Sequence, residues 1–163
     1  GGTEEPSGDA ILEESFNNTF GNFTPVSVSG AQEWKTDSYG YVSMSAYSNG
    51  VSLENEDWLV SPAVDLSKEH TLTFEHAMGP KNQDLSNAPE QYTVWVSTDY
   101  NGDVTTATWT QVNITYPATS GWTFETVTTK LPAVGAKAYF AFKYKNAENA
   151  NTITWEIKNL SVK

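Results

Sequence analysis

The chain is dominated by short segments in which apolar residues occupy every second position. In residues 138–144 these positions hold Ala138, Phe140, Phe142 and Tyr144. Such alternation places successive side chains on opposite faces of a β-strand, so that one face is apolar. The same alternation occurs in residues 41–47, 71–76, 92–96, 112–114 and 153–157. The sequence therefore predicts about nine half-buried strands and no amphipathic helix.

Turn-forming residues separate these segments, as at Asn49-Gly50, Asn101-Gly102 and Leu131-Pro132. Many short strands with Gly- and Pro-rich connections favour two packed antiparallel sheets over a parallel α/β design. The 163 residues suit one domain, which we expect to cover residues 10–163. Its core is predicted to contain Trp58, Val60, Leu72, Phe74, Val94, Phe140, Phe142, Trp155 and Ile157.

Residues 1–9 read GGTEEPSGD and show no apolar periodicity. A composition rich in Gly, Glu, Pro and Ser is typical of a flexible tether, so these residues are expected to be disordered. Two origins fit such a segment: the leader of an exported protein, with a lipid-bearing cysteine just upstream, or a linker between domains of a longer chain.

Charge and composition exclude several classes of partner. The formal net charge is −11, and all nine basic residues are lysines. A chain of this charge repels polyanions, and it lacks arginine, the residue best suited to bidentate phosphate recognition. No run of 18 apolar residues occurs, and there is no cysteine for thiol chemistry or thiolate metal sites. Nucleic acid, anionic membrane surfaces and a membrane-spanning segment are therefore not expected.

The run NEDWLVSPAVDLS at residues 55–67 carries a more specific signal. It resembles the D/N-W-L-I/V-S/T-P-x-ϕ-D-L element of the choice-of-anchor J and cleaved-adhesin domains, where ϕ is an aliphatic residue. Further motifs of these domains are similar to, in order, residues 13–16, Trp34, residues 39–41, residues 92–100, residues 108–112 and the closing TWEIKNLSV at residues 154–162.

This resemblance implies a jelly-roll β-sandwich of the kind found in surface and secreted proteins of Gram-negative bacteria. It also implies a location that is extracellular or on the outer-membrane surface. The implied role is a non-catalytic module that binds a glycan or a host or bacterial surface protein. A structural spacer in a surface lipoprotein is the second interpretation, and a small hydrolase acting on glycans is the third.

The resemblance raises the question of a structural calcium ion. Related jelly rolls hold Ca²⁺ where the first and last strands meet, and Glu14 and Glu156 are the matching carboxylates. Lys158 stands where the closing motif usually has an aspartate. Its ammonium could replace the cation by pairing with Glu14 or Glu156, so calcium and lysine remain alternatives.

Residues 99–103, which read DYNGD, resemble the first half of a calcium loop. Thr110, however, stands where an EF-hand needs its bidentate glutamate. An Asp/Asn/Gly turn is therefore the preferred interpretation of this segment.

The sequence contains no catalytic constellation. His76 shares a strand face with Leu72 and Phe74, which predicts a hydrogen-bonded core histidine, and no serine lies in a G-x-S-x-G elbow. Glu54, Glu56 and Asp57 gather before Trp58, where a solvated rim is the expected structure. Enzyme activity is accordingly not predicted.

The six tryptophans and eight tyrosines exceed what a core of this size needs. Flat aromatic faces serve both sugar rings and protein partners, and the candidates beside turns or on outward faces are Trp95, Tyr100, Trp109 and Trp122. A long connection at residues 77–91 is the expected ligand-facing loop. For each aromatic, packing in the core is the alternative.

Overall fold

A computed structural model describes residues 10–148 and 150–163 of the protein. The predicted leader at residues 1–9 lies outside the described residues. Sheet A contains β1 (Leu12–Glu14), β3 (Lys35–Thr36), β4 (Val42–Met44), β9 (His70–Gly79), β12 (Gly121–Leu131) and β14 (Thr154–Val162). Sheet B contains β2 (Thr24–Ser29), β7 (Asn55–Val60), β8 (Val64–Leu66), β10 (Tyr92–Ser97), β11 (Thr110–Val112) and β13 (Gly135–Asn146).

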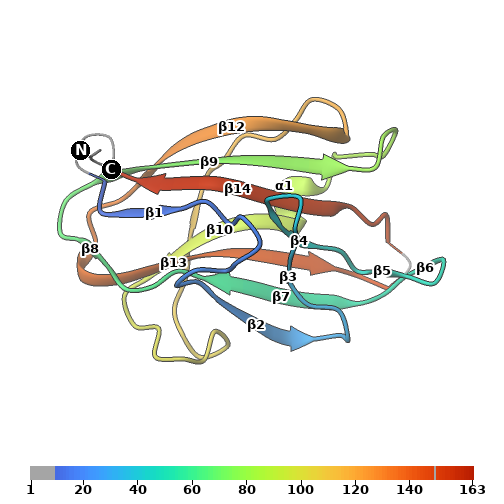
Figure 1. Ribbon diagram of the computed structural model, residues 1–163. Coiled ribbons are helices and arrows are strands. Elements are labelled where there is room, and N and C mark those ends of the chain that lie inside the picture. The colour runs from blue at the N-terminus through green and yellow to red at the C-terminus, as the bar shows by residue number, and fades with distance from the viewer. Residues whose placement is uncertain (1–9, 149) are drawn as a thin grey trace.

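All strand pairs in the two sheets are antiparallel. Sheet A has the order β12-β9-β14-β4-β3, with β1 paired to β14. Sheet B has the order β11-β10-β13-β7-β2, with β8 paired to β13. Figure 1 shows the resulting sandwich, in which the start of β1 and the C-terminus lie at the same end of the sheets. The predicted all-β jelly-roll sandwich is confirmed.

The end of the sandwich away from the C-terminus carries a small hairpin of β5 (Tyr47–Ser48) and β6 (Val51–Ser52) (Figure 1). Its two turn residues, Asn49 and Gly50, have φ of 50° and 83°. Positive φ at both positions is what a tight two-residue hairpin turn requires, and Asn-Gly is the sequence that adopts it most readily.

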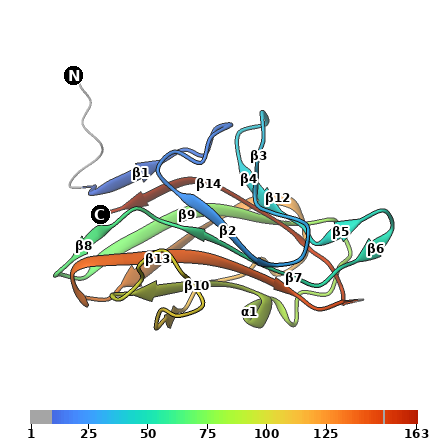
Figure 2. The same cartoon turned by 90° about the horizontal axis from the view of Figure 1, so that it is seen from below.

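The described residues contain fourteen strands, more than the roughly nine that alternation predicts. Some of the additional strands, such as β3, β5 and β6, have only two residues, too few for a period of two to be recognised. Two longer strands, β2 and β12, also lie outside the segments in which alternation is found. Residues 77–79 belong to the end of β9, and α1 (Ala88–Gln91) follows, so the predicted loop at 77–91 is reduced to residues 80–87. Figure 2 shows α1 at the margin of the sandwich, where it packs on β10 and β13. In the described part of the chain, no helix is long and apolar enough to cross a membrane.

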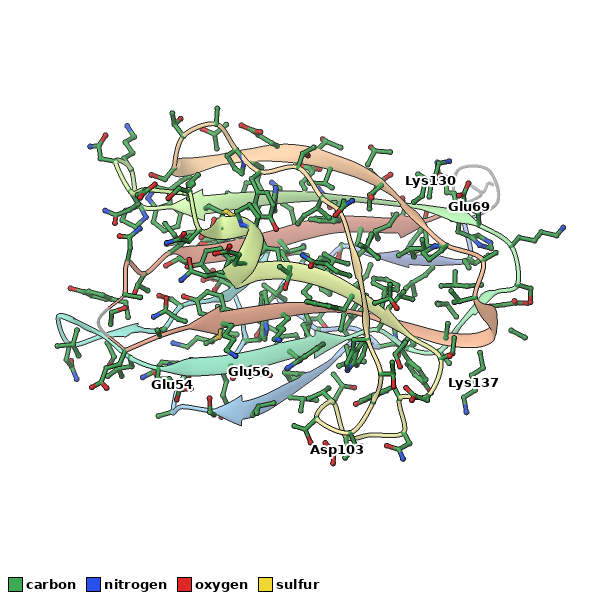
Figure 3. The ribbon with its side chains drawn as sticks, turned by 180° about the vertical axis from the view of Figure 1, so that it is seen from behind. Glu54, Glu56, Glu69, Asp103, Lys130 and Lys137 are labelled. Carbon is green, nitrogen blue, oxygen red and sulfur yellow. The ribbon has the colours of Figure 1, made fainter. Side chains whose placement is uncertain are left out.

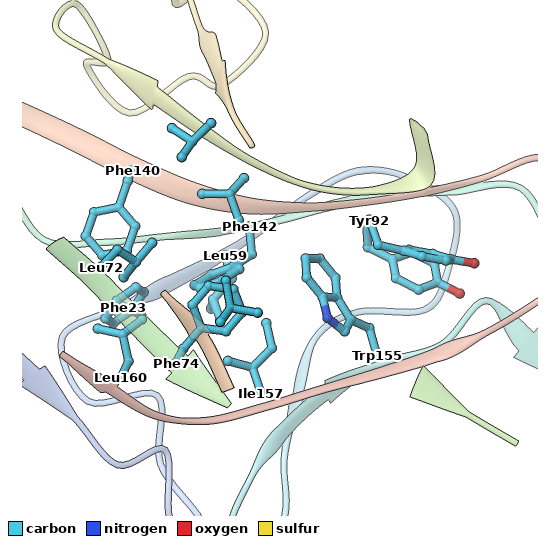
Figure 4. Packing of buried hydrophobic residues seen from close by; sticks show 14 of the residues in the cluster. Phe23, Leu59, Leu72, Phe74, Tyr92, Phe140, Phe142, Trp155, Ile157 and Leu160 are labelled. Atoms are coloured by element: carbon cyan, nitrogen blue, oxygen red, sulfur yellow. The ribbon is translucent and has the colours of Figure 1, made fainter. Parts of the chain in front are cut away.

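The core lies between the two sheets and is rich in aromatic rings (Figure 4). Phe142 of β13 meets Phe74 of β9 edge to face, with 5.1 Å between ring centroids, and contacts Trp155 of β14 at 5.8 Å. All nine residues predicted to form the core are buried. Trp58 and Val60, however, lie on the opposite face of β7 from Leu59 and belong to a separate cluster.

Candidate functional site

A second apolar cluster, here called the outer cluster, covers the outer face of sheet B. It consists of Val26, Trp58, Val60, Trp95, Tyr100, Val104, Trp109, Tyr139 and Ala141. Strand alternation explains it: Leu59 and Phe142 point into the core, so their neighbours Trp58 and Ala141 point outward. Three of the four aromatic ligand candidates are thereby brought together, whereas Trp122 lies elsewhere.

The register of sheet B sets the spacing within the outer cluster. Ala141 stands opposite Trp95 on one side and Val60 on the other. Lys143, two residues further along β13, stands opposite Trp58. The small alanine thus has Trp95 on one side and Val60 on the other, and the ammonium of Lys143 lies near the indoles of Trp58 and Trp95.

The connection between β10 and β11, residues 98–109, folds back over this face of the sheet and is tied by two aspartates. Asp99 accepts hydrogen bonds of 2.8 Å from both the Ser97 hydroxyl and the Thr108 backbone N–H. Asp103 accepts from the backbone N–H and the hydroxyl of Thr105. Figure 3 shows Asp103 at the tip of this loop, beyond the sheet. The Asp/Asn/Gly turn predicted for residues 99–103 is therefore confirmed.

The loop presents Trp109 and Tyr100 to the sheet. The Trp109 ring lies 4.8 Å from the Trp58 ring between centroids, at an interplanar angle of 36°. Tyr100 contacts Trp109 at 5.7 Å and meets Tyr139 edge to face at 5.0 Å. The four rings form a continuous aromatic surface from β7 to β13.

A groove of about 380 Å³ opens beside these rings. It is lined by Val28, Glu56, Trp58, Trp95, Val104, Thr105, Ala107, Trp109 and Lys143. The Lys143 ammonium lies 5.1 Å from the Trp58 ring centroid and 5.4 Å from that of Trp95, within cation–π distance of both. Burial lowers the pKa of Lys143 from its ordinary value, with the Glu56 carboxylate acting in the opposite direction.

The indole N–H groups of the groove already have acceptors inside the protein. Trp58 donates to Glu56 Oε2 at 2.9 Å, Trp95 to Thr93 Oγ1 at 2.7 Å, and Trp109 to the Val104 carbonyl at 3.0 Å. These bonds fix the orientation of the rings. Trp95 and Trp109 are half-buried and can offer ring surface to a ligand, whereas Trp58 is buried beneath Trp109 and Lys143. The polar side chains beside them that a ligand can reach are Glu56, Lys143 and Thr105.

Trp122, the fourth aromatic candidate, lies on β12 at the edge of sheet A and is 48% exposed. It lines a different hollow, together with residues of the 80–87 connection. The expected ligand-facing loop and Trp122 are thus neighbours. They lie beside sheet A, whereas the outer cluster lies on sheet B.

The two candidate calcium ligands have different surroundings. Glu14 on β1 stands opposite Leu160 and accepts a 3.4 Å hydrogen bond from the Phe16 backbone N–H. Glu156 is buried, and its pKa is raised by burial, while a hydrogen bond from Tyr41 lowers it. In the described ranges, no three His, Cys, Asp or Glu side chains gather as a metal ligand set. Calcium shared by these two glutamates stays a prediction.

Lys158, the alternative to calcium, does not lie in an ion pair with either glutamate. Its ammonium lies over the Phe124 ring, 4.2 Å from the centroid. The ion pairs among the described residues join Lys130 with Glu69 and Lys145 with Glu56. The positive charge of Lys158 still acts on Glu156 at longer range and lowers its pKa slightly against the effect of burial.

The predicted core histidine is confirmed. His76 is buried, and its Nδ1 accepts a 3.0 Å hydrogen bond from the Trp155 indole. The prediction of a solvated acidic rim is wrong for Asp57, which is buried on the same side of β7 as Leu59. Burial raises the pKa of Asp57 to about 7, the Ser27 hydroxyl lowers it, and the charges of Glu33 and Glu56 raise it further.

The sandwich is similar to solved structures of adhesin and carbohydrate-binding domains. The K1 cleaved adhesin domain of Lys-gingipain from Porphyromonas gingivalis W83 matches with a TM-score of 0.63 and 22% identity, over 96% of this chain and 98% of that chain. The K3 domain of the same protein matches with a TM-score of 0.65 and 17% identity, over 94% and 98%. The N-terminal cellulose-binding domain of Cellulomonas fimi β-1,4-glucanase C matches with a TM-score of 0.54 and 13% identity, over 98% and 97%.

At these identities the likeness shows the fold, and it agrees with the fold that the cleaved-adhesin resemblance implies. No family model matches the chain, and no curated protein matches it. Membership of the choice-of-anchor J family therefore stays a prediction.

Proposed function

We propose that the protein is a non-catalytic binding module of a surface or secreted protein, and that the groove of the outer cluster holds a neutral glycan. The observation that carries the proposal is the set of three indoles, Trp58, Trp95 and Trp109, which line one groove together with Lys143 and Glu56. Aromatic faces give stacking area to the C–H faces of a sugar, and nearby polar groups give selectivity.

Charge favours a neutral ligand over an acidic one. The chain carries a formal net charge of −11 and no arginine. Lys143 supplies one positive charge in the groove, but Glu56 lies within the same lining. A sulfated or uronic chain would meet repulsion from the protein as a whole, whereas the hydroxyl groups of a neutral sugar can hydrogen-bond to both side chains.

Two features support binding over the alternatives of a spacer or a hydrolase. A spacer has no use for an aromatic groove, since its surface only separates other domains. Glycoside hydrolysis usually needs two carboxylates that flank one cleft, and Glu56 is the only carboxylate among the residues lining this groove. The similar folds of adhesin and cellulose-binding domains support a role in adhesion outside the cell or on its surface.

Isothermal titration of the protein with neutral and acidic polysaccharides tests the proposal. We expect binding to a neutral polysaccharide that changes little with salt, and a loss of at least roughly tenfold in the Trp95→Ala variant. Tyr39→Ala is the matched control, because Tyr39 is an aromatic residue that is 84% exposed and lies outside the groove.

Preferential binding of acidic polysaccharides would contradict the charge argument. Unchanged binding in Trp95→Ala would exclude the groove. If no glycan binds, a protein partner or a spacer role replaces the proposal, and pull-down by host or bacterial surface proteins separates those two.

A further inference from the structure

The strand register places a row of outward-facing residues across sheet A. The row lies at the end of the sandwich that carries the β5–β6 hairpin, which Figure 1 shows. In register there, Met78 pairs with Trp155, and Trp155 pairs with Met44. All three point into the core and are buried. Their chain neighbours therefore point to the outer face, which places Gly79, Thr154 and Ser45 in one line across β9, β14 and the end of β4.

Trp122 of the edge strand β12 lies flat against this row at Gly79. A Cβ atom built on Gly79 would lie 2.5 Å from Cδ2 and Cε3 of the indole and 2.6 Å from Cε2. Cδ2 lies at the ring fusion and is bonded to the other two, so only a face-on approach brings all three equally near. One face of the indole is thus packed on the glycine, and the side chain keeps 48% of its surface exposed.

Tyr47 stands at the other end of the row and is 59% exposed. Its backbone N–H donates to the Ser45 hydroxyl at 3.2 Å. Next to it, the Leu53 N–H donates to the Ala46 carbonyl at 3.0 Å, which closes the base of the β5–β6 hairpin. The backbone that carries Tyr47 is therefore fixed even though its ring faces solvent.

Two neighbouring hollows lie beside these aromatic residues, one lined by Tyr47 and the other by Trp122, and Gln83 lines both. The first, of about 580 Å³, includes Ser45, Tyr47, Ser52, Pro80, Gln83, Asn151, Thr152 and Thr154. The second, of about 610 Å³, includes residues 81–85, 118–121, Trp122 and Thr123. The 80–87 connection between them is anchored, because the Gln83 N–H donates to Ser120 Oγ at 2.6 Å and the Asn151 amide donates to the Asp84 carbonyl at 2.9 Å.

The lining defines the ligand chemistry. It consists mainly of hydroxyl and amide side chains, and its charged residues, Lys81 and Asp84, are opposite in sign. The strands from β12 to β4 span three inter-strand spacings, or about 14 Å. A ligand that covers this distance, offers many hydroxyls and presents C–H faces to a ring at each end is an oligosaccharide chain rather than a single sugar.

We propose that this surface, here called the sheet A groove, is a second binding site that takes an extended neutral glycan chain, with Trp122 and Tyr47 as stacking platforms at its two ends. The inference rests on the proposed glycan function but uses a face of the molecule separate from the outer cluster. It assigns a role to Tyr47 and Trp122, two of the three exposed aromatic residues that lie outside the outer cluster.

Titration with neutral β-1,4-linked oligosaccharides, from disaccharide to hexasaccharide, tests this site. We expect affinity to increase with chain length and then level off once both platforms are reached. Trp122→Ala and Tyr47→Ala should each lower hexasaccharide affinity roughly tenfold and leave disaccharide binding nearly unchanged. Gly79→Ala should resemble Trp122→Ala, because the added methyl displaces the indole.

The outer-cluster variant Trp95→Ala separates the two sites. Full hexasaccharide binding in Trp95→Ala, with loss in Trp122→Ala, supports the sheet A groove even if the outer cluster fails as a site. Loss in Trp95→Ala with full binding in Trp122→Ala and Tyr47→Ala overturns the sheet A groove and leaves the first proposal intact. Affinity independent of chain length, or no binding of any oligosaccharide, also overturns it.

Discussion

The indole Nε1 of Trp155 donates a hydrogen bond of 3.0 Å to Nδ1 of His76, and this bond joins β14 to β9 inside the sandwich. Nδ1 can accept it only while it carries no proton. Burial lowers the pKa of His76 to about 4, while a hydrogen bond between His76 and the backbone of Thr115 raises it. The histidine is thus a neutral structural residue at neutral pH, and its titration provides a measurable link between pH and stability.

We expect His76 to make the protein sensitive to acid. Its pKa is about 4 in the folded state and about 6.5 when unfolded, so the unfolded chain binds the proton first. The stability contributed by neutral His76 is therefore full above the unfolded pKa and is lost as the pH falls through the folded pKa. Urea unfolding of His76→Asn, followed by tryptophan fluorescence from pH 7 to pH 4, should show a weaker loss. An equal loss would show that other groups govern the acid response.

Asp57 should act with the opposite sign. Its folded pKa of about 7 exceeds its ordinary value of 3.8, so the folded state holds the proton more tightly than the unfolded chain does. The stabilising effect is full below the unfolded pKa and is lost as the pH rises through about 7. Asp57→Asn should therefore be more stable than wild type at pH 8 by up to about 4 kcal/mol, at 1.4 kcal/mol per pKa unit. The difference should shrink toward pH 4, and a constant difference across this range would contradict the pKa argument.

The sequence predicts the faces of individual strands better than it predicts which strands meet. Alternation places Trp155 in the core and turns Trp95 away from Val94 and Val96, and both predictions are confirmed. The prediction that Trp58 is buried is also confirmed, but Trp58 packs in the outer cluster and not in the core between the sheets. Residues 58–60 of β7 form a continuous apolar run that is buried on both faces of the strand. Such a run does not reveal that one face is covered by the loop at residues 98–109, far away in the chain.

Lys143 is the functional candidate that sequence reasoning missed. The pattern of β13 turns it to the same face as Ala141, but nothing in the sequence shows that Trp58 stands opposite. Cross-strand register depends on contacts between residues far apart in the chain, here 58 and 143. The same limit hides the proximity of Trp122 and Gly79, which is set by the pairing of β12 with β9.

Truncation of the shared aromatic core should be costly. Phe142 is fully buried and contacts both Phe74 and Trp155. We expect Phe142→Ala to lower the free energy of unfolding by about 3 to 5 kcal/mol, because it removes apolar contacts and leaves a cavity. Ile157→Val, which removes one methylene from the same core, is the matched control and should cost only about 0.5 to 1.5 kcal/mol. Similar losses in the two variants, measured by chemical denaturation, would argue against tight packing around Phe142.

Removal of metal tests whether calcium is bound at the junction of the first and last strands. A calcium ion held by Glu14 and Glu156 would stabilise the folded state by mass action, so a chelator should lower the melting temperature of the wild type. In that case Glu14→Gln would melt at this lower temperature both with and without the chelator. We expect instead that the chelator leaves the melting temperature of the wild type unchanged. The Glu156 side chain already accepts a hydrogen bond from Tyr41, and Glu14 accepts one from the Phe16 backbone N–H. A melting temperature that falls in the chelator and recovers when calcium is restored would show that backbone carbonyls and water complete a site around these two carboxylates.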